Sequence, residues 1–121
     1  MPRPEVVEAF IAAVEANDHI GAIERFYADD ASMQENLAPP RVGRSLLMQN
    51  EARVLAGVKA VRSRCVRPVL IEGDTVAINW IFEFDYPDGR TRRIDEIAHQ
   101  TWRDDKVWRE RFYYDPAQLK G

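Results

Sequence analysis

The chain has 121 residues, a formal net charge of −3 and 45% hydrophobic residues. A chain of this length can bury roughly two-thirds of its unfolded surface, so we predict a single domain over residues 1–121. The mild acidity argues against a nucleic-acid-binding protein, and no apolar run is long enough to predict a membrane span. The single cysteine, Cys65, excludes an intramolecular disulfide and suits a reducing compartment, so we expect a cytoplasmic protein. With only two isolated histidines besides, we predict no metal site and no cofactor.

Helical patterns occupy the N-terminal half of the sequence. Val7, Phe10 and Val14 recur at helical spacing and predict a first helix that continues to about residue 16. Asp18 is a good N-cap for a second helix, which ends before Asp29. A third helix is predicted over residues 46–55, with Gly57 as the residue that ends it.

The remaining segments alternate like strands. Residues 31–36 predict a short strand, and the Pro-Pro sequence within residues 37–43 predicts a loop. Helices packed on one curved antiparallel sheet form an α+β architecture, in which the sheet curls into a cone around an apolar cavity. Four further strands are predicted, over Val58–Ile71, Thr75–Asp85, Arg93–Arg103 and Val107–Tyr114.

The last two predicted strands decide what lines this cavity. They fold back at residues 104–106, and successive side chains point to opposite faces of a sheet. A shift of one residue in their pairing would exchange the two faces, so the assignment has an alternative. With the expected pairing, Trp102 and Trp108 are near neighbours in the core. The inward faces are then Ile94, Glu96, Ala98, Gln100 and Trp102 on the first strand and Trp108, Glu110, Phe112 and Tyr114 on the second.

Three segments carry a family resemblance. They are Phe26–Ala31 (FYADDA), Pro40–Arg44 (PRVGR) and the final strand from Lys106 to Asp115. In these segments the chain resembles the nuclear transport factor 2-like superfamily, closest to its SnoaL-like polyketide cyclase and ketosteroid isomerase branches. The resemblance implies a cone-shaped antiparallel sheet wrapped around N-terminal helices, the cystatin-like roll. It leaves the activity open, because this scaffold carries isomerases, cyclases, hydrolases, dehydratases and non-catalytic binders.

The catalytic residues of ketosteroid isomerase carry over only in part. The resemblance places its general base at Glu35, which is still a carboxylate. Its oxyanion-binding tyrosine and protonated aspartate fall on Phe10 and Ala98, neither of which can donate a hydrogen bond. SnoaL-type cyclases also place an acid at the position of Ala98. Steroid isomerisation by the family mechanism is therefore not expected.

Glu35 is the predicted general base. We expect it on the cavity side of its strand with Met33, against an apolar wall with no cation that raises its pKa; the alternative is a strand-end carboxylate paired with an arginine. Glu96 and Glu110 are expected to assist, unless neighbouring arginines pair with them. The predicted binding residues are Phe10, Val14, Phe26, Met33, Asn79, Glu96, Ala98, Glu110, Phe112 and Tyr114.

The predicted function follows from this cavity. We expect a SnoaL-like protein that holds an apolar small molecule in the cone, with no nucleic-acid or membrane partner. If it is an enzyme, proton abstraction, isomerisation or a lyase step on a carbonyl-type ligand fits; the alternative is a non-catalytic ligand-binding or dimerisation module. A homodimer is also expected, through an outer sheet face that carries Ile97 and Tyr113, with Trp80 and Phe82 as further candidates.

Overall fold

The structure is a computed structural model that describes residues 1–120. Its helices begin at residues suited to that position. Helix α1 starts at Pro4, where the missing N–H would be unpaired in any case. The Asp18 side chain caps α2 by accepting a hydrogen bond from the Gly21 N–H at 3.2 Å. Gly43, at the N-cap of α3, has φ +108°, a value that favours glycine. The helices are α1 (Pro4–Glu15), α2 (His19–Phe26), α3 (Arg44–Ala56) and the 3-10 helix η1 (Pro116–Leu119).

Six strands form one sheet in the order β2-β1-β6-β5-β4-β3. Neighbouring strands are antiparallel except β1 and β6, which run parallel, so the sheet is mixed rather than purely antiparallel. The difference arises because the first strand pairs with the last one in the chain. A two-residue strand, β2, also forms inside the predicted loop and pairs with β1. The strands are β1 (Tyr27–Glu35), β2 (Arg41–Val42), β3 (Ala60–Glu72), β4 (Thr75–Asp85), β5 (Thr91–Arg103) and β6 (Lys106–Tyr113).

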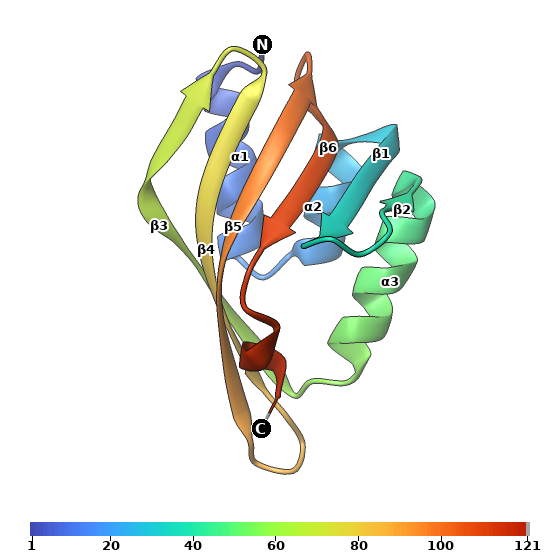
Figure 1. Ribbon diagram of the computed structural model, residues 1–121, viewed down its shortest axis with the longest axis vertical. Helices are drawn as coiled ribbons and strands as arrows, with labels where there is room; N and C mark the ends of the chain where they lie inside the picture. The colour runs from blue at the N-terminus through green and yellow to red at the C-terminus, as the bar shows by residue number, and fades with distance from the viewer. Residues whose placement is uncertain (121) are drawn as a thin grey trace.

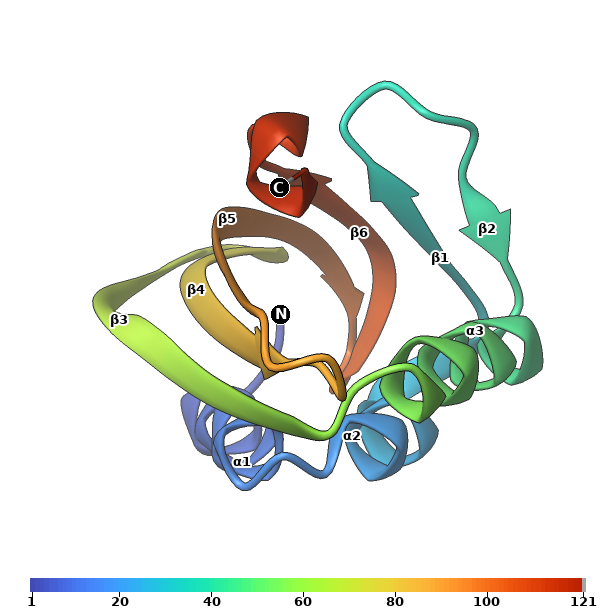
Figure 2. The ribbon, with the colours of Figure 1, turned by 90° about the horizontal axis from the view of Figure 1, so that it is seen from below.

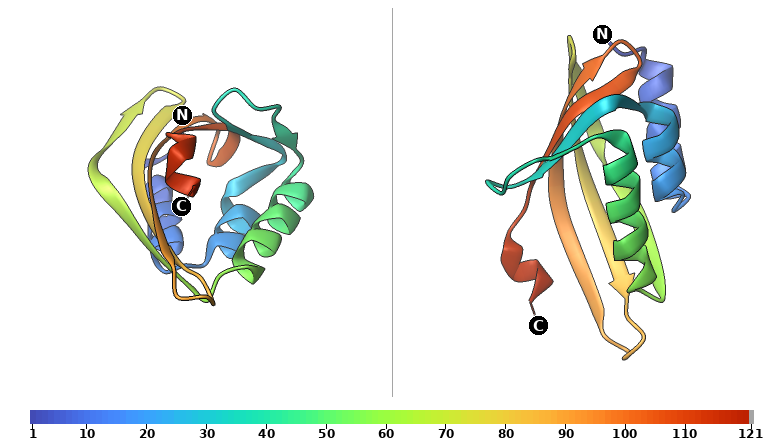
Figure 3. Two further views of the ribbon diagram at one scale, coloured as in Figure 1. Left: turned by 60° about the horizontal axis from the view of Figure 1, so that its bottom comes forward. Right: turned by 90° about the vertical axis from the view of Figure 1, so that its right-hand side faces the viewer.

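The sheet curves around the helices and remains open. Helices α1, α2 and α3 all lie on its concave side (Figures 1 and 3). Seen from below, β3, β4, β5 and β6 bend around the space that the helices close on the other side (Figure 2). The core lies between these layers, where Phe10 and Trp102 meet edge to face with ring centroids 6.0 Å apart. The predicted α+β cone is therefore confirmed.

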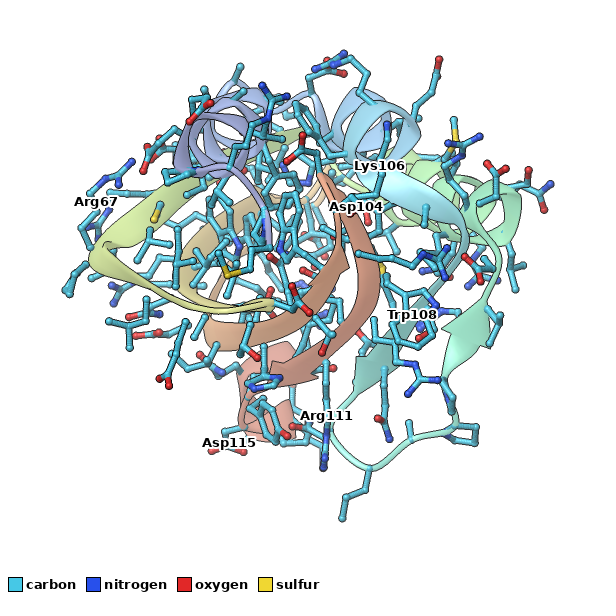
Figure 4. The ribbon with its side chains drawn as sticks, turned by 90° about the horizontal axis from the view of Figure 1, so that it is seen from above. Arg67, Asp104, Lys106, Trp108, Arg111 and Asp115 are labelled. Atoms are coloured by element: carbon cyan, nitrogen blue, oxygen red, sulfur yellow. The ribbon has the colours of Figure 1, made fainter. Side chains whose placement is uncertain are left out.

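A β-bulge changes the facing of one residue in the last hairpin. Ala98 pairs with Phe112, but the register shifts so that Trp102 pairs with Val107. Trp102 is buried, whereas Trp108 is turned to the convex side and packs its ring under the Arg109 guanidinium at 4.0 Å. In Figure 4 the side chain of Trp108 points away from the helices. The prediction that Trp102 and Trp108 are neighbours in the core is therefore wrong. The bulge inserts one extra residue into the final strand, which turns Trp108 to the other face.

No helix within residues 1–120 has the length and apolar character needed to cross a membrane.

Candidate functional site

A cavity of about 360 Å³ lies between the concave face of the sheet and the helices. At its inner end the lining includes buried side chains, among them Phe10, Tyr27 and Glu110. At its outer end the lining includes Gly57 and Leu119, which are exposed to solvent. The cavity is thus closed at one end and open at the other, as expected of a small-molecule site.

One wall of the cavity is a row of aromatic side chains on β4 and at Tyr86, the residue directly after it. Trp80 and Phe82 are stacked with ring centroids 5.5 Å apart and an interplanar angle of 19°. Phe84 continues the row, 6.3 Å from Phe82, and Tyr86 follows it. We call Trp80, Phe82, Phe84 and Tyr86 the aromatic track. The expectation that Trp80 and Phe82 lie on the outer face is wrong, since strand alternation turns both inward and leaves Asn79 outside.

A buried polar chain ends at the Glu110 carboxylate. The Trp102 indole N–H donates to Gln100 Oε1 at 2.9 Å, which orients the Gln100 amide so that its Nε2 donates to Glu110 Oε2 at 2.5 Å. The Tyr27 hydroxyl donates to the other carboxylate oxygen, Oε1. Burial raises the pKa of Glu110 to about 7, although these two hydrogen bonds oppose the shift. Burial and the nearby Glu110 raise the pKa of Tyr27 well above its usual value, so Tyr27 remains a donor.

Glu96 lines the same cavity without such support. Within residues 1–120, no side chain forms a hydrogen bond or ion pair with its carboxyl group. Burial, followed by the negative charges of Glu110, Glu35 and Glu51, raises the pKa of Glu96 to about 8. Glu96 is therefore mostly protonated at neutral pH, while Glu110 is near its midpoint. Two carboxyl groups in one cavity thus hold their protons to different pH values.

Glu35 lies at the rim and is paired with a cation. Its side chain lines the cavity but is 43% exposed, and its Oε2 is 3.0 Å from Arg41 Nη2. The pair forms because β2 places Arg41 opposite Met33 across the ladder. The expected apolar wall without a cation is therefore wrong. Next to this pair, burial and the charge of Glu35 raise the pKa of Tyr114 to about 12.

Three of the predicted binding residues do not line the cavity. Asn79 is on the outer face, where its amide donates to Asp95 Oδ1 at 2.7 Å and to the Glu96 carbonyl at 3.0 Å. Phe26 packs its ring edge to face on Phe10, and Ala98 is fully buried within the sheet. The predicted residues that do line it are Phe10, Val14, Met33, Glu35, Glu96, Glu110, Phe112 and Tyr114.

Sequence reasoning missed a second polar group in the lining, centred on His19. His19 Nδ1 is 3.4 Å from Glu51 Oε1, and Nε2 is 2.8 Å from Ser63 Oγ. The Ser63 hydroxyl donates its own proton to Asn17 Oδ1 at 2.8 Å, so His19 is not placed to activate it as a nucleophile. We interpret the group as a clamp that joins α2, α3 and β3. Nothing in the spacing of these residues signals it, since they meet only in the folded chain.

Tyr27 was also missed, although it is part of the FYADDA segment. Its spacing predicts a place in the apolar stripe of the second helix, whereas β1 begins at this residue and directs the hydroxyl toward Glu110. Among residues 1–120, no group of three or more histidine, cysteine or acidic side chains is arranged to hold a metal ion.

Several solved structures are similar to this one over nearly its whole length. TerC, co-crystallised with polyporic acid, has a TM-score of 0.79 and 21% identity, with 95% of this chain and 92% of that chain covered. A Mesorhizobium loti protein described as a SnoaL-like polyketide cyclase has a TM-score of 0.76 and 24% identity, covering 91% and 97%. A Catenulispora acidiphila protein with a ketosteroid isomerase-like fold, in complex with trimethylamine, has a TM-score of 0.80 and 19% identity, covering 96% and 89%.

These identities establish the shared fold. No curated protein matches the chain. The sequence model of the SnoaL-like domain family, however, matches residues 7–110, which is most of the chain. The protein therefore belongs to the SnoaL-like domain family.

Proposed function

We propose that the protein binds a planar, largely apolar small molecule with a carbonyl group and transfers a proton on it with Glu96 and Glu110. The observation that carries this proposal is a pair of cavity carboxyl groups, both with raised pKa, beside the aromatic track and without an ion-pairing cation. General acids and bases work best when their pKa lies near the working pH. Both groups meet that condition.

The two carboxyl groups have different roles in the proposed step. Glu96 is protonated at neutral pH and donates its proton to the carbonyl oxygen. Ionised Glu110, oriented by Tyr27 and Gln100, accepts a proton from the carbon next to the carbonyl. The product is the enol, with one proton lost by Glu96 and one gained by Glu110. Return of the Glu110 proton to another carbon, while the enol gives its proton back to Glu96, gives isomerisation. A β-substituent that leaves with its bonding electrons and takes the Glu110 proton, while the enol gives its proton back to Glu96, gives a lyase reaction.

This proposal moves the base from the predicted Glu35 to Glu110. The salt bridge with Arg41 keeps the Glu35 carboxylate at the exposed rim, away from the buried polar chain. The fold relatives add support for the ligand class. One was co-crystallised with polyporic acid, and another is described as a polyketide cyclase.

Deuterium exchange tests the proposal without knowledge of the natural substrate. 4-Acetylbiphenyl is an elongated, largely apolar aryl ketone whose methyl protons exchange through the enol. In D₂O near pH 7, we expect the protein to accelerate loss of the methyl signal in proton NMR spectra. Glu96→Gln and Glu110→Gln should each lower the rate by roughly 10²-fold or more, a typical contribution of a positioned acid or base.

Glu35→Gln is the matched control, since it removes a lining carboxylate outside the proposed machinery. It should keep most of the exchange rate. Binding of the ketone without accelerated exchange would favour the non-catalytic module and refute proton transfer.

A further inference from the structure

Arg92 near the open end of the cavity has an unsatisfied donor. Its Nε is buried and has no hydrogen-bond partner within residues 1–120. The guanidinium lies over the Tyr86 ring, 5.0 Å from the ring centroid, and no described carboxylate forms an ion pair with it. Buried polar groups in native proteins are usually hydrogen-bonded, so an unpaired cationic donor calls for an acceptor. The described residues do not supply one.

Two other arginines, by contrast, form ion pairs. Arg41 pairs with Glu35 at 3.0 Å, and Arg90 pairs with Asp88 at 2.7 Å. Arg92 is therefore a cation behind the Tyr86 side of the cavity wall, with no ion-pairing carboxylate among residues 1–120.

The strand register places Arg92 in line with the proposed reactive end. Across the β4–β5 ladder, Trp80 pairs with Glu96 and Phe84 pairs with Arg92. Arg92 and Glu96 share the inner face of β5, four residues apart, which is about 13 Å along a strand. Arg92 does not itself line the cavity, but its ladder partner Phe84 and its ring partner Tyr86 both do. The aromatic track thus extends from a carboxyl group to a guanidinium group.

We propose that the ligand carries an anionic group, such as a carboxylate, at the end remote from its carbonyl, and that Arg92 binds this group at the cavity mouth. A guanidinium and a carboxylate match in geometry, because two parallel N–H groups meet two oxygens. The track is the right surface for the flat apolar frame between the two ends. The inference rests on the proposed function for the placement of the carbonyl beside Glu96 and Glu110.

The acidic residues of the cavity do not oppose this orientation. Glu35 is neutralised by Arg41, and Glu51 faces His19. The inner carboxyl groups lie toward the far end of the track. An anion therefore meets Arg92 before it meets an unpaired carboxylate, whereas the reverse orientation would place it against Glu96.

The test compares two probes that differ in charge. 4′-Acetylbiphenyl-4-carboxylate has the proposed anion, and its primary amide is the neutral match. Isothermal titration calorimetry at pH 7 should show that the carboxylate binds the wild-type protein at least about tenfold more tightly, as charge-assisted hydrogen bonds require. Arg92→Gln should abolish this preference and change the affinity for the amide less than about twofold.

Two further variants keep the test decisive. Arg93→Gln removes the same charge from the exposed outer face of β5, so it should leave the preference unchanged. Arg92→Lys keeps the positive charge without the two parallel N–H donors of the guanidinium, so it should retain only part of the preference for the carboxylate. This variant tests the anion site if Arg92→Gln fails to fold.

Several results would overturn the inference. These are no binding of the carboxylate to the wild type, equal affinity for both probes, or an equal loss in Arg93→Gln and Arg92→Gln. The deuterium exchange of the same probes separates the two proposals. An Arg92-dependent preference without accelerated exchange supports the anion site and refutes proton transfer. Accelerated exchange of both probes without a preference supports proton transfer and refutes the anion site.

Discussion

Glu96→Gln should make the protein more stable, and the gain should grow with pH. The pKa of Glu96 is raised from 4.5 to about 8. Between these values the unfolded chain releases this proton while the folded protein keeps it, so rising pH favours unfolding. Above about pH 8 Glu96 is ionised in the folded protein as well, and the full cost of burying its charge lowers the free energy of unfolding. At about 1.4 kcal/mol for each pKa unit, the upper bound is roughly 5 kcal/mol. Water entering the open cavity lowers the cost of the buried charge. We therefore expect Glu96→Gln to raise the free energy of unfolding by about 3 kcal/mol above pH 8.

Glutamine has the shape of the protonated side chain and no charge to desolvate. Urea denaturation followed by tryptophan fluorescence at pH 5, 7 and 9 measures the effect. The difference between Glu96→Gln and wild type should be smallest at pH 5 and largest at pH 9. As a control, Glu35→Gln should lower the free energy of unfolding by at most about 1 kcal/mol at pH 7, because the salt bridge that it removes is exposed. Equal or lower stability of Glu96→Gln at pH 9 would refute a buried, uncompensated carboxyl group.

The other predictions concern the buried polar chain, the bulge and the assembly. Tyr27→Phe should destabilise the fold by roughly 1–3 kcal/mol, more at pH 9 than at pH 5, because the charged form of Glu110 needs the lost donor most; a pH-independent effect in urea denaturation would contradict this. Trp102→Ala should cost about 3–5 kcal/mol and Trp108→Ala about 1 kcal/mol in the same assay, and the reverse order would show that the bulge is misplaced. The outer sheet face exposes Ile97 at 42%, and we expect a homodimer there. Light scattering should report twice the chain mass of 14.0 kDa, falling to one chain mass in Ile97→Glu, and a monomeric wild type would refute the dimer.

Local patterns were enough to predict the main elements of the fold. The apolar stripe of Val7, Phe10 and Val14 and the cap at Asp18 lie within single helices, so neighbouring residues determine them. Two features depend on contacts distant in sequence. The parallel pairing of β1 with β6 joins residues about eighty positions apart, and Trp102, beside the bulge, packs against Phe10 of α1. Alternation alone cannot predict an inserted residue.

The candidate site was predictable to the same degree. Glu96, Glu110 and Phe112 face inward because strand alternation holds around them. The pairing of Glu35 with Arg41 was not predictable, because it depends on a strand of only two residues.

The alternation of β4 gives this strand two surfaces that can change independently. Trp80 and Phe84 belong to the cavity wall, while Asn79 and Glu83 belong to the outer sheet face. A smaller residue at Phe84 would lengthen the space for a ligand without altering the convex surface, and a substitution at Glu83 would do the reverse. Ligand selectivity and surface contacts can therefore diverge separately among descendants of such a sequence. A library that varies only Phe82 and Phe84 would explore new ligands on an otherwise constant scaffold.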